Sequence, residues 1–188
     1  MCGIYGQISQ VPFADTRALC CARDTMVHRG PDDAGEWLSS DRQVFLAHRR
    51  LSILDLSELA NQPMCDASGQ YVIVFNGEIY NYLDIRSDLV ELGYSFRSQS
   101  DTEVVLQAYR QWGRDCVSRF NGMFAFAIYD CSRQEIFLAR DRAGEKPLYY
   151  SNHAGMFCFA SELKAIMARL DFAREIDMNA LDCYLNFG

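Results

Sequence analysis

The chain has 188 residues, 49% of them hydrophobic, and a formal net charge of -7 from 18 basic and 25 acidic residues. One domain of this length buries enough apolar surface to fold without a disulfide or a metal ion. The acidic balance argues against a nucleic-acid surface and against attraction to anionic lipid, so we expect neither nucleic acid nor membrane as a partner.

Export signals and metal-ligand patterns are absent from the sequence. The first residues contain no basic segment with a long apolar core, and no apolar run approaches the ~18 residues of a membrane span, which predicts a cytoplasmic protein. The eight cysteines are scattered without a C-x-x-C pair, so we expect them to stay reduced. The histidines, His28, His48 and His153, are isolated from one another, and we expect no metal site.

Hydrophobic periodicity and turn residues predict a strand at 2–8 and then a helix that begins near Asp15, as its N-cap, and ends before Gly30. That helix should direct four residues toward a core: Leu19, Cys21, Ala22 and Met26. Further strands are expected at 44–47, 51–54, 71–75, 123–129, 134–139, 148–151 and 156–160. Further helices are expected at 83–92, 101–112, 162–170 and 178–185.

Cap and turn residues mark the ends of several of these elements. Gly93 should close one helix, Ser100-Asp-Thr-Glu103 has the form of a capping box, and Ser161 should cap the helix at 162–170. Asn76-Gly77 ordinarily signals a tight turn between two strands, and this interpretation stays open beside a role in a site.

The order of elements is strands, helices, strands and helix, with hairpins predominating. This order predicts an α+β fold with mainly antiparallel sheets and helices on their outer faces. Residues 1–170 form one expected domain. Residues 171–188 begin polar and then carry an apolar helical edge, Leu181, Tyr184 and Leu185, which predicts a linker and the first helix of a further domain that is absent from this chain.

Cys2 is the strongest chemical signal, because removal of Met1 would place a thiol and a free α-amine on one residue. The thiol titrates near ~8.5 and the amine near ~7.7–8.0, so internal proton transfer is nearly balanced at neutral pH. N-terminal nucleophiles of this kind suit acyl transfer from an amide or ester. On these two residues alone, an accidental Met-Cys start is the favoured interpretation, and only the rest of the sequence reverses it.

Five segments together go beyond periodicity: Met1-Cys-Gly-Ile-Tyr-Gly6, His28-Arg-Gly-Pro-Asp32, Ala47-His-Arg-Arg-Leu-Ser-Ile53, Val74-Phe-Asn-Gly-Glu-Ile-Tyr-Asn81 and Ser100-Asp-Thr-Glu103. This set resembles the class II glutamine amidotransferase domain found in glutamine-hydrolysing asparagine synthetases. The resemblance extends from Cys2 to about Leu170 and includes 120–126, 140–144 and 146–150. It implies the N-terminal-nucleophile hydrolase fold, a four-layer αββα sandwich with two mainly antiparallel sheets.

The resemblance also assigns roles. Cys2 would be the nucleophile, and the Asn76 side chain with the Gly77 backbone N–H would form the oxyanion hole. Arg50 would bind the α-carboxylate of glutamine and Asp101 its α-ammonium, with backbone groups near Leu51 to Ile53 and Glu78 completing the pocket.

Alternatives remain for several of these residues. Asp101 could instead only cap its helix. Strand alternation should turn Arg49 away from the site. His28 and Arg29 are expected to hold the loop over Cys2, and His48 to be a hydrogen-bonded core residue.

The resemblance implies hydrolysis of glutamine to glutamate through a Cys2 thioester, with the ammonia passed to an ATP-dependent synthetase domain. That domain would be C-terminal or separate, and ATP and Mg would bind there, because this chain has no pyrophosphate or Walker-type loop and needs no cofactor of its own. The acceptor could be aspartate or another carboxylate such as a sugar acid. Hydrolysis of other amides and a non-catalytic interaction domain are the competing functions, and a homodimer is left open.

Two residues depart from the family pattern. Glu145 precedes Lys146-Pro-Leu-Tyr-Tyr150 in place of a small aliphatic residue, where such enzymes contact their second domain. Ala60 replaces a common glycine before Asn61-Gln-Pro-Met64. We expect neither Glu145 nor Ala60 to touch the site.

Overall fold

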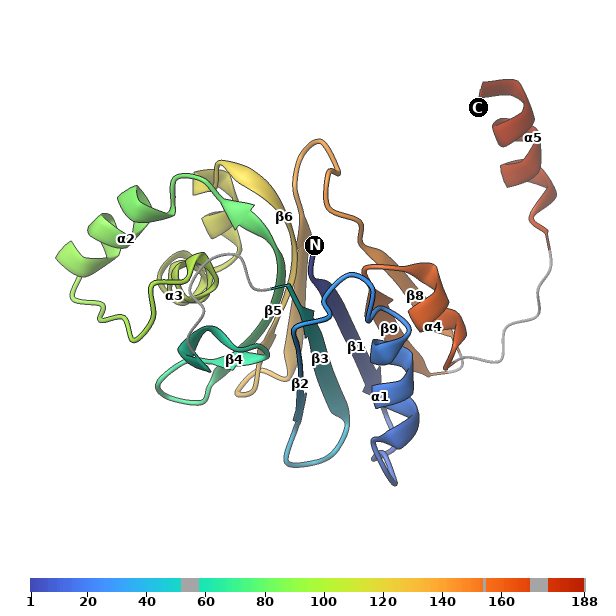
Figure 1. Ribbon diagram of the computed structural model, residues 1–188, viewed down its shortest axis with the longest axis horizontal. Helices are drawn as coiled ribbons and strands as arrows, with labels where there is room; N and C mark the ends of the chain where they lie inside the picture. The colour runs from blue at the N-terminus through green and yellow to red at the C-terminus, as the bar shows by residue number, and fades with distance from the viewer. Residues whose placement is uncertain (52–57, 154, 170–175, 188) are drawn as a thin grey trace.

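The computed structural model describes residues 1–51, 58–153, 155–169 and 176–187, and its centre is a pair of stacked sheets (Figure 1). The five-stranded sheet has the order β2 (Asp33–Leu38), β3 (Val44–Arg50), β1 (Gly3–Ser9), β9 (Met156–Ala160), β8 (Tyr149–His153). The four-stranded sheet has the order β4 (Met64–Cys65), β5 (Tyr71–Ile79), β6 (Gly122–Asp130), β7 (Glu135–Arg140). Every strand pair is antiparallel.

Helices cover the outer face of each sheet. On one side lie α1 (Arg17–Asp24) and α4 (Leu163–Met167), and on the other lie α2 (Tyr82–Glu91) and α3 (Asp101–Trp112) (Figure 1). The remaining helical segments are η1 (Glu58–Ala60), η2 (Gly113–Arg119) and α5 (Met178–Phe187). The predicted α+β fold, a four-layer αββα sandwich with two antiparallel sheets, is confirmed.

Three apolar layers follow from strand alternation. The layer between the sheets contains Ile4, Val44, Leu46, Val72, Val74, Ala125, Ala127, Tyr129 and Phe159. Neighbouring residues point outward instead: Tyr5 and Ala47 pack with α1 and α4, and Phe75 packs with α3. Because successive side chains alternate between the two faces, His48 and Arg50, two and four positions beyond Leu46 in β3, also face the four-stranded sheet.

The helix and strand positions expected from the sequence are largely confirmed, with differences at caps and ends. α1 has Thr16 as its N-cap instead of Asp15, although the Asp15 carboxylate accepts the Arg17 N–H at 3.0 Å. Cys21 is exposed, contrary to the prediction, while Leu19, Ala22 and Met26 are buried.

The cap predicted at Ser161 is wrong. The Ser161 hydroxyl accepts the Ile4 N–H at 3.0 Å, so this residue extends the pairing of β9 with β1. α4 therefore begins later, at Leu163 with Glu162 as N-cap, and ends at Met167. Of the strand expected at 51–54, Leu51 lies in no strand, and the rest falls outside the described residues.

β2 and β4 were not expected. β2 is an edge strand with a short run of mixed polarity, and neither a periodic pattern nor β-branched residues signal it. Gly35 in β2 is required sterically, because a Cβ there would clash with the carbonyl oxygen of Gln62.

The alternative interpretation of Asn76-Gly77 as a turn is excluded, because β5 continues through both residues to Ile79, which pairs with Gly122 of β6. The capping box is half formed. Ser100 accepts the Thr102 N–H at 3.1 Å, whereas the Glu103 carboxylate binds the N–H groups of Arg97 and Ser98.

The C-terminal helix expected at 178–185 is present as α5, which has no buried residue. The linker and further domain assigned to 171–188 stay a prediction. No helix within the described ranges is both long enough and apolar enough to span a bilayer.

Candidate active site

A cavity lies where the start of β1 and the end of β3 approach the open edge of β5. Its walls come from both sheets and from the first turn of α3, and its lining residues are Met1, Cys2, His48, Arg50, Leu51, Ala60, Gln62, Phe75, Asn76, Gly77, Glu78, Ser100, Asp101, Thr102, Met123 and Lys146. The fold thus brings together every site residue predicted from the sequence except Ile53, which lies outside the described residues.

Cys2 is held against the end of β3. Its Sγ lies 3.4 Å from the Leu51 N and 3.7 Å from the Leu51 carbonyl oxygen, and its own carbonyl accepts the Arg29 Nε–H at 2.9 Å. Burial raises the pKa of the Cys2 thiol, against the opposing effects of the Leu51 N–H, the terminal amine, Arg50 and Arg29. A thiol in this setting needs a nearby base to ionise at neutral pH.

The Asn76 side chain faces the five-stranded sheet, on the same side of β5 as Val72 and Val74. Asn76 is only 2% exposed, and its Nδ2 has no hydrogen-bond partner in the part of the chain that the structure describes. A buried donor without a partner carries a free-energy cost of about 1–3 kcal/mol, which an acceptor entering the cavity would relieve.

The Gly77 backbone N–H lies at the open edge of β5. Phe75 N–H donates to Gln62 Oε1 at 2.6 Å and Ile79 N–H donates to Asp101 Oδ2 at 3.0 Å, both away from β6. Because N–H groups of residues i and i+2 in a strand point the same way, the Gly77 N–H lies between these two bonds and faces the cavity. A Cβ on Gly77 would clash with the Met123 carbonyl.

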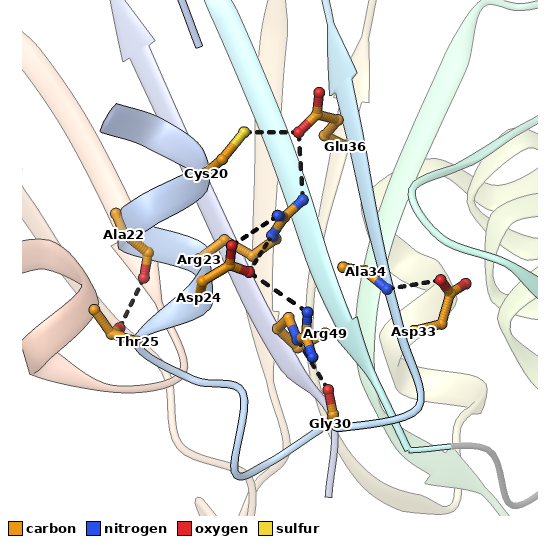
Figure 2. A network of polar contacts seen from close by, with 10 residues as sticks. All are labelled: Cys20, Ala22, Arg23, Asp24, Thr25, Gly30, Asp33, Ala34, Glu36 and Arg49. Carbon is orange, nitrogen blue, oxygen red and sulfur yellow. Dashed lines mark hydrogen bonds and ion pairs between the residues drawn. The ribbon is translucent and has the colours of Figure 1, made fainter. Parts of the chain in front are cut away.

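Arg50 and Arg49 point to opposite faces, as predicted. Arg49 turns toward α1, where it donates to the Gly30 carbonyl at 2.9 Å and pairs with Asp24 at 3.5 Å (Figure 2). Arg50 lines the cavity, is 8% exposed and donates to the Asn61 side-chain oxygen.

Asp101 is the first residue of α3 and is 5% exposed. The helix cap comes from Ser100, so capping does not account for the Asp101 carboxylate, whose Oδ2 accepts the Ile79 N–H. Burial raises the pKa of Asp101 to about 6, with Glu78 adding to the rise and the N–H groups of Ile79 and Thr102 opposing it. A buried carboxylate so poised favours a cationic ligand.

His28, Arg29 and Glu162 form a cluster beside Cys2. Glu162 Oε1 lies 2.9 Å from His28 Nε2 and 3.2 Å from an Arg29 guanidinium nitrogen. Since Arg29 also binds the Cys2 carbonyl, this cluster holds the loop against the chain start, as expected.

His48 is a core residue, also as expected. Its Nε2 lies 3.1 Å from the Phe75 carbonyl oxygen, and burial lowers the pKa of His48 to about 4. The imidazole is therefore neutral at physiological pH and serves as a hydrogen-bond donor to Phe75.

Some lining residues were missed. Gln62, Thr102, Met123 and Lys146 line the cavity, and the only signal for Gln62 was its place in the Asn61–Met64 motif. Ala60 also lines the cavity, so the expectation that it lies away from the site is wrong; a short backbone connection brings it beside Gln62. Within the described residues, no cluster of His, Cys, Asp and Glu has the form of a metal site.

Cys2, the second residue of the chain, lies in a cavity at the edge of two stacked antiparallel sheets. The glutamine phosphoribosylpyrophosphate amidotransferase of Bacillus subtilis, complexed with ADP and GMP, matches 88% of this chain and 43% of its own, with a TM-score of 0.72 and 18% identity. At this identity the likeness concerns the fold. The glutamine amidotransferase domain model matches residues 1–188, and the chain belongs to this family.

Curated relatives are longer proteins. The chain is 40% identical to asparagine synthetase [glutamine-hydrolyzing] 3 of Bacillus subtilis, over 100% of this chain and 31% of that protein. It is 41% identical to amidase chry2 of Gibberella zeae, over 77% of this chain and 22% of that protein. The chain thus spans less than a third of the length of either relative.

Proposed function

We propose that this domain hydrolyses the side-chain amide of glutamine to glutamate and ammonia. The Cys2 thiolate attacks the carboxamide carbon, and the negative charge that develops on its oxygen is met by Asn76 Nδ2 and the Gly77 N–H. The C–N bond then breaks, ammonia leaves with the proton given up by the thiol, and water hydrolyses the thioester. The observation that carries the proposal is the buried Asn76 Nδ2, which has no hydrogen-bond partner among the described residues and lies in the same cavity as Cys2.

Recognition of a free amino acid explains the two charges in the cavity. The Arg50 guanidinium would bind the α-carboxylate, and the Asp101 carboxylate would bind the α-ammonium. The backbone of Leu51 and Glu78, and of Ile53, would complete the pocket. An apolar amide substrate would offer no charged group to either residue, which argues against hydrolysis of other amides.

The mechanism requires removal of Met1. While Met1 remains, the Cys2 nitrogen is a non-basic amide, and the nearest amine is one residue away, about 3.5 Å along the chain. The processed amine would take the thiol proton directly or through one water. Intact mass measured beside glutaminase activity tests this step; full turnover by protein that retains Met1 is the contrary result.

The ammonia would serve an ATP-dependent synthetase domain in a longer protein. The share of each relative that this chain spans supports such an arrangement. Aspartate is the first candidate acceptor, and another carboxylate, such as a sugar acid, is the second. ATP and Mg would bind on the synthetase domain.

Cys2→Ala tests the chemistry, with Cys21→Ala as the matched control because Cys21 is exposed and outside the cavity. Cys2→Ala should abolish glutamine hydrolysis while calorimetry still detects glutamine binding, and Cys21→Ala should behave like the parent. An electrophilic glutamine analogue should label Cys2 alone. Turnover by Cys2→Ala would exclude Cys2 as the nucleophile, and a parent with Met1 removed that does not hydrolyse glutamine would favour a non-catalytic domain.

A further inference from the structure

The Gln62 side chain joins two walls of the cavity. Gln62 is 9% exposed, its Oε1 accepts the Phe75 N–H at 2.6 Å, and its Nε2 donates to Thr102 Oγ1 at 3.2 Å. Phe75 immediately precedes Asn76, and Thr102 immediately follows Asp101. The Gln62 amide therefore links β5, which carries the Asn76 and Gly77 donors, to the first turn of α3, which carries the Asp101 carboxylate.

The Phe75 backbone is held at both of its polar groups. Its N–H is bound by Gln62, and its carbonyl lies 3.1 Å from Nε2 of His48, which projects from β3 of the other sheet. His48 stays neutral at physiological pH, so this contact does not change there. Fixing Phe75 also fixes the direction of the Gly77 N–H, two residues further along the same edge.

The Gln62 backbone is itself supported. β2 approaches it at Gly35, where a Cβ would clash with the Gln62 carbonyl oxygen. The preceding residue, Asn61, accepts a hydrogen bond from Arg50. The segment 61–62 therefore contacts one proposed substrate anchor directly and, through Gln62, adjoins the oxyanion donors on β5 and the carboxylate on α3.

We propose that Gln62 is a positioning residue for amide hydrolysis. It sets the spacing between the oxyanion donors on β5 and the ammonium anchor on α3, and it touches no reacting atom. This inference rests on the proposed glutaminase function. The oxyanion forms only once the thiolate attacks and is absent from ground-state glutamine, so displacing Asn76 and Gly77 lowers kcat, whereas Arg50 and Asp101 still bind the ground state.

The first test is Gln62→Met, which keeps the side-chain length and removes both hydrogen bonds. We expect kcat to fall about 10²-fold, as for other small displacements of catalytic groups, while KM stays within about threefold of the parent. Active sites are counted by labelling with the electrophilic glutamine analogue, so that kcat refers to correctly folded protein.

The second test uses the helix end of the link and does not disturb Gln62 itself. Thr102→Val is nearly isosteric and removes the hydroxyl that accepts from Gln62, whereas Thr102→Ser keeps it. Thr102→Val should lower kcat per labelled site, and Thr102→Ser should recover most of that loss. A general loss of stability would not explain a low kcat per labelled site in Thr102→Val together with its recovery in Thr102→Ser.

The outcomes separate this inference from the proposed function. A parent protein with Met1 removed that does not hydrolyse glutamine overturns both. If the parent is active and Gln62→Met and Thr102→Val both keep a kcat per labelled site within threefold of the parent value, only the positioning role is overturned. The same holds if total activity falls only in proportion to the number of labelled sites. If Gln62→Met does not fold, the Thr102→Val and Thr102→Ser pair decides the matter alone.

Discussion

Replacing Asp101 with Asn separates the contribution of this carboxylate to binding from its effect on folding. Asp101 is buried, and its pKa of about 6 lies above the 3.8 of the unfolded chain. The folded state therefore holds this proton more tightly than the unfolded state, and folding stability falls as pH rises from about 3.8 to about 6. Asn keeps an oxygen for the Ile79 N–H and has no such titration.

The size of the effect follows from the two pKa values. A difference of about two between 3.8 and about 6 corresponds to roughly 3 kcal/mol once the pH is well above 6. Relaxation around the charge reduces the measured value, so we expect Asp101→Asn to be more stable than the parent by roughly 1–3 kcal/mol at pH 7.5 and nearly equal to it below pH 4.

The assay is urea unfolding of parent and variant at several pH values, because the difference between them cancels the titration of all other groups. Asp141→Asn is the matched control with the opposite sign. Burial raises the pKa of Asp141, but the N–H groups of Lys146, Glu145, Phe124 and Gly144 outweigh it and lower the pKa overall. Its stabilisation is therefore present at neutral pH and lost in acid, so Asp141→Asn should be destabilised at pH 7.5 and less so in acid.

Glutamine kinetics complete the experiment. If Asp101 binds the α-ammonium, Asp101→Asn should raise KM for glutamine by roughly 10- to 100-fold, as expected for a lost charged hydrogen bond. The KM of the parent should also rise as the pH falls through about 6, where Asp101 gains a proton. A variant less stable than the parent at pH 7.5, or a stability difference that does not change with pH, would refute the electrostatic argument.

Two further substitutions test the anchors and the strand. Arg50→Ala should raise KM for glutamine roughly 10- to 100-fold with kcat nearly unchanged, because it removes a contact made in ground and transition states alike. Arg49→Ala, on the opposite face, should leave KM as it is; equal KM values for both variants would contradict the assignment. Gly77→Ala should be destabilised by about 1–3 kcal/mol in urea unfolding, because its Cβ would clash with the Met123 carbonyl, and should lose most of its kcat. Parent-like stability and kcat for Gly77→Ala would contradict that geometry.

Local sequence patterns determined a large part of this protein. The order of strands and helices predicted antiparallel sheets with helices on their outer faces, and the period of two along β3 was enough to separate Arg49 from Arg50. These predictions succeeded because they depend only on the geometry of consecutive residues. The resemblance to a known family, not local geometry, predicted that Cys2, Asn76 and Asp101 share one site, and all three line one cavity.

Tertiary structure decided what depends on contacts between distant residues. β2 exists as a strand because β3 lies beside it, and Asn76-Gly77 is extended because nine residues of β5 pair with β6. The depressed pKa of His48 and the raised pKa of Asp101 come from burial, which neither residue's sequence neighbours set. The linking role of Gln62 is visible only in the folded structure, where Phe75 and Thr102 bind the two ends of its side-chain amide. A hydrogen bond between residues far apart in the chain leaves no periodic trace in the sequence, so only the folded structure reveals it.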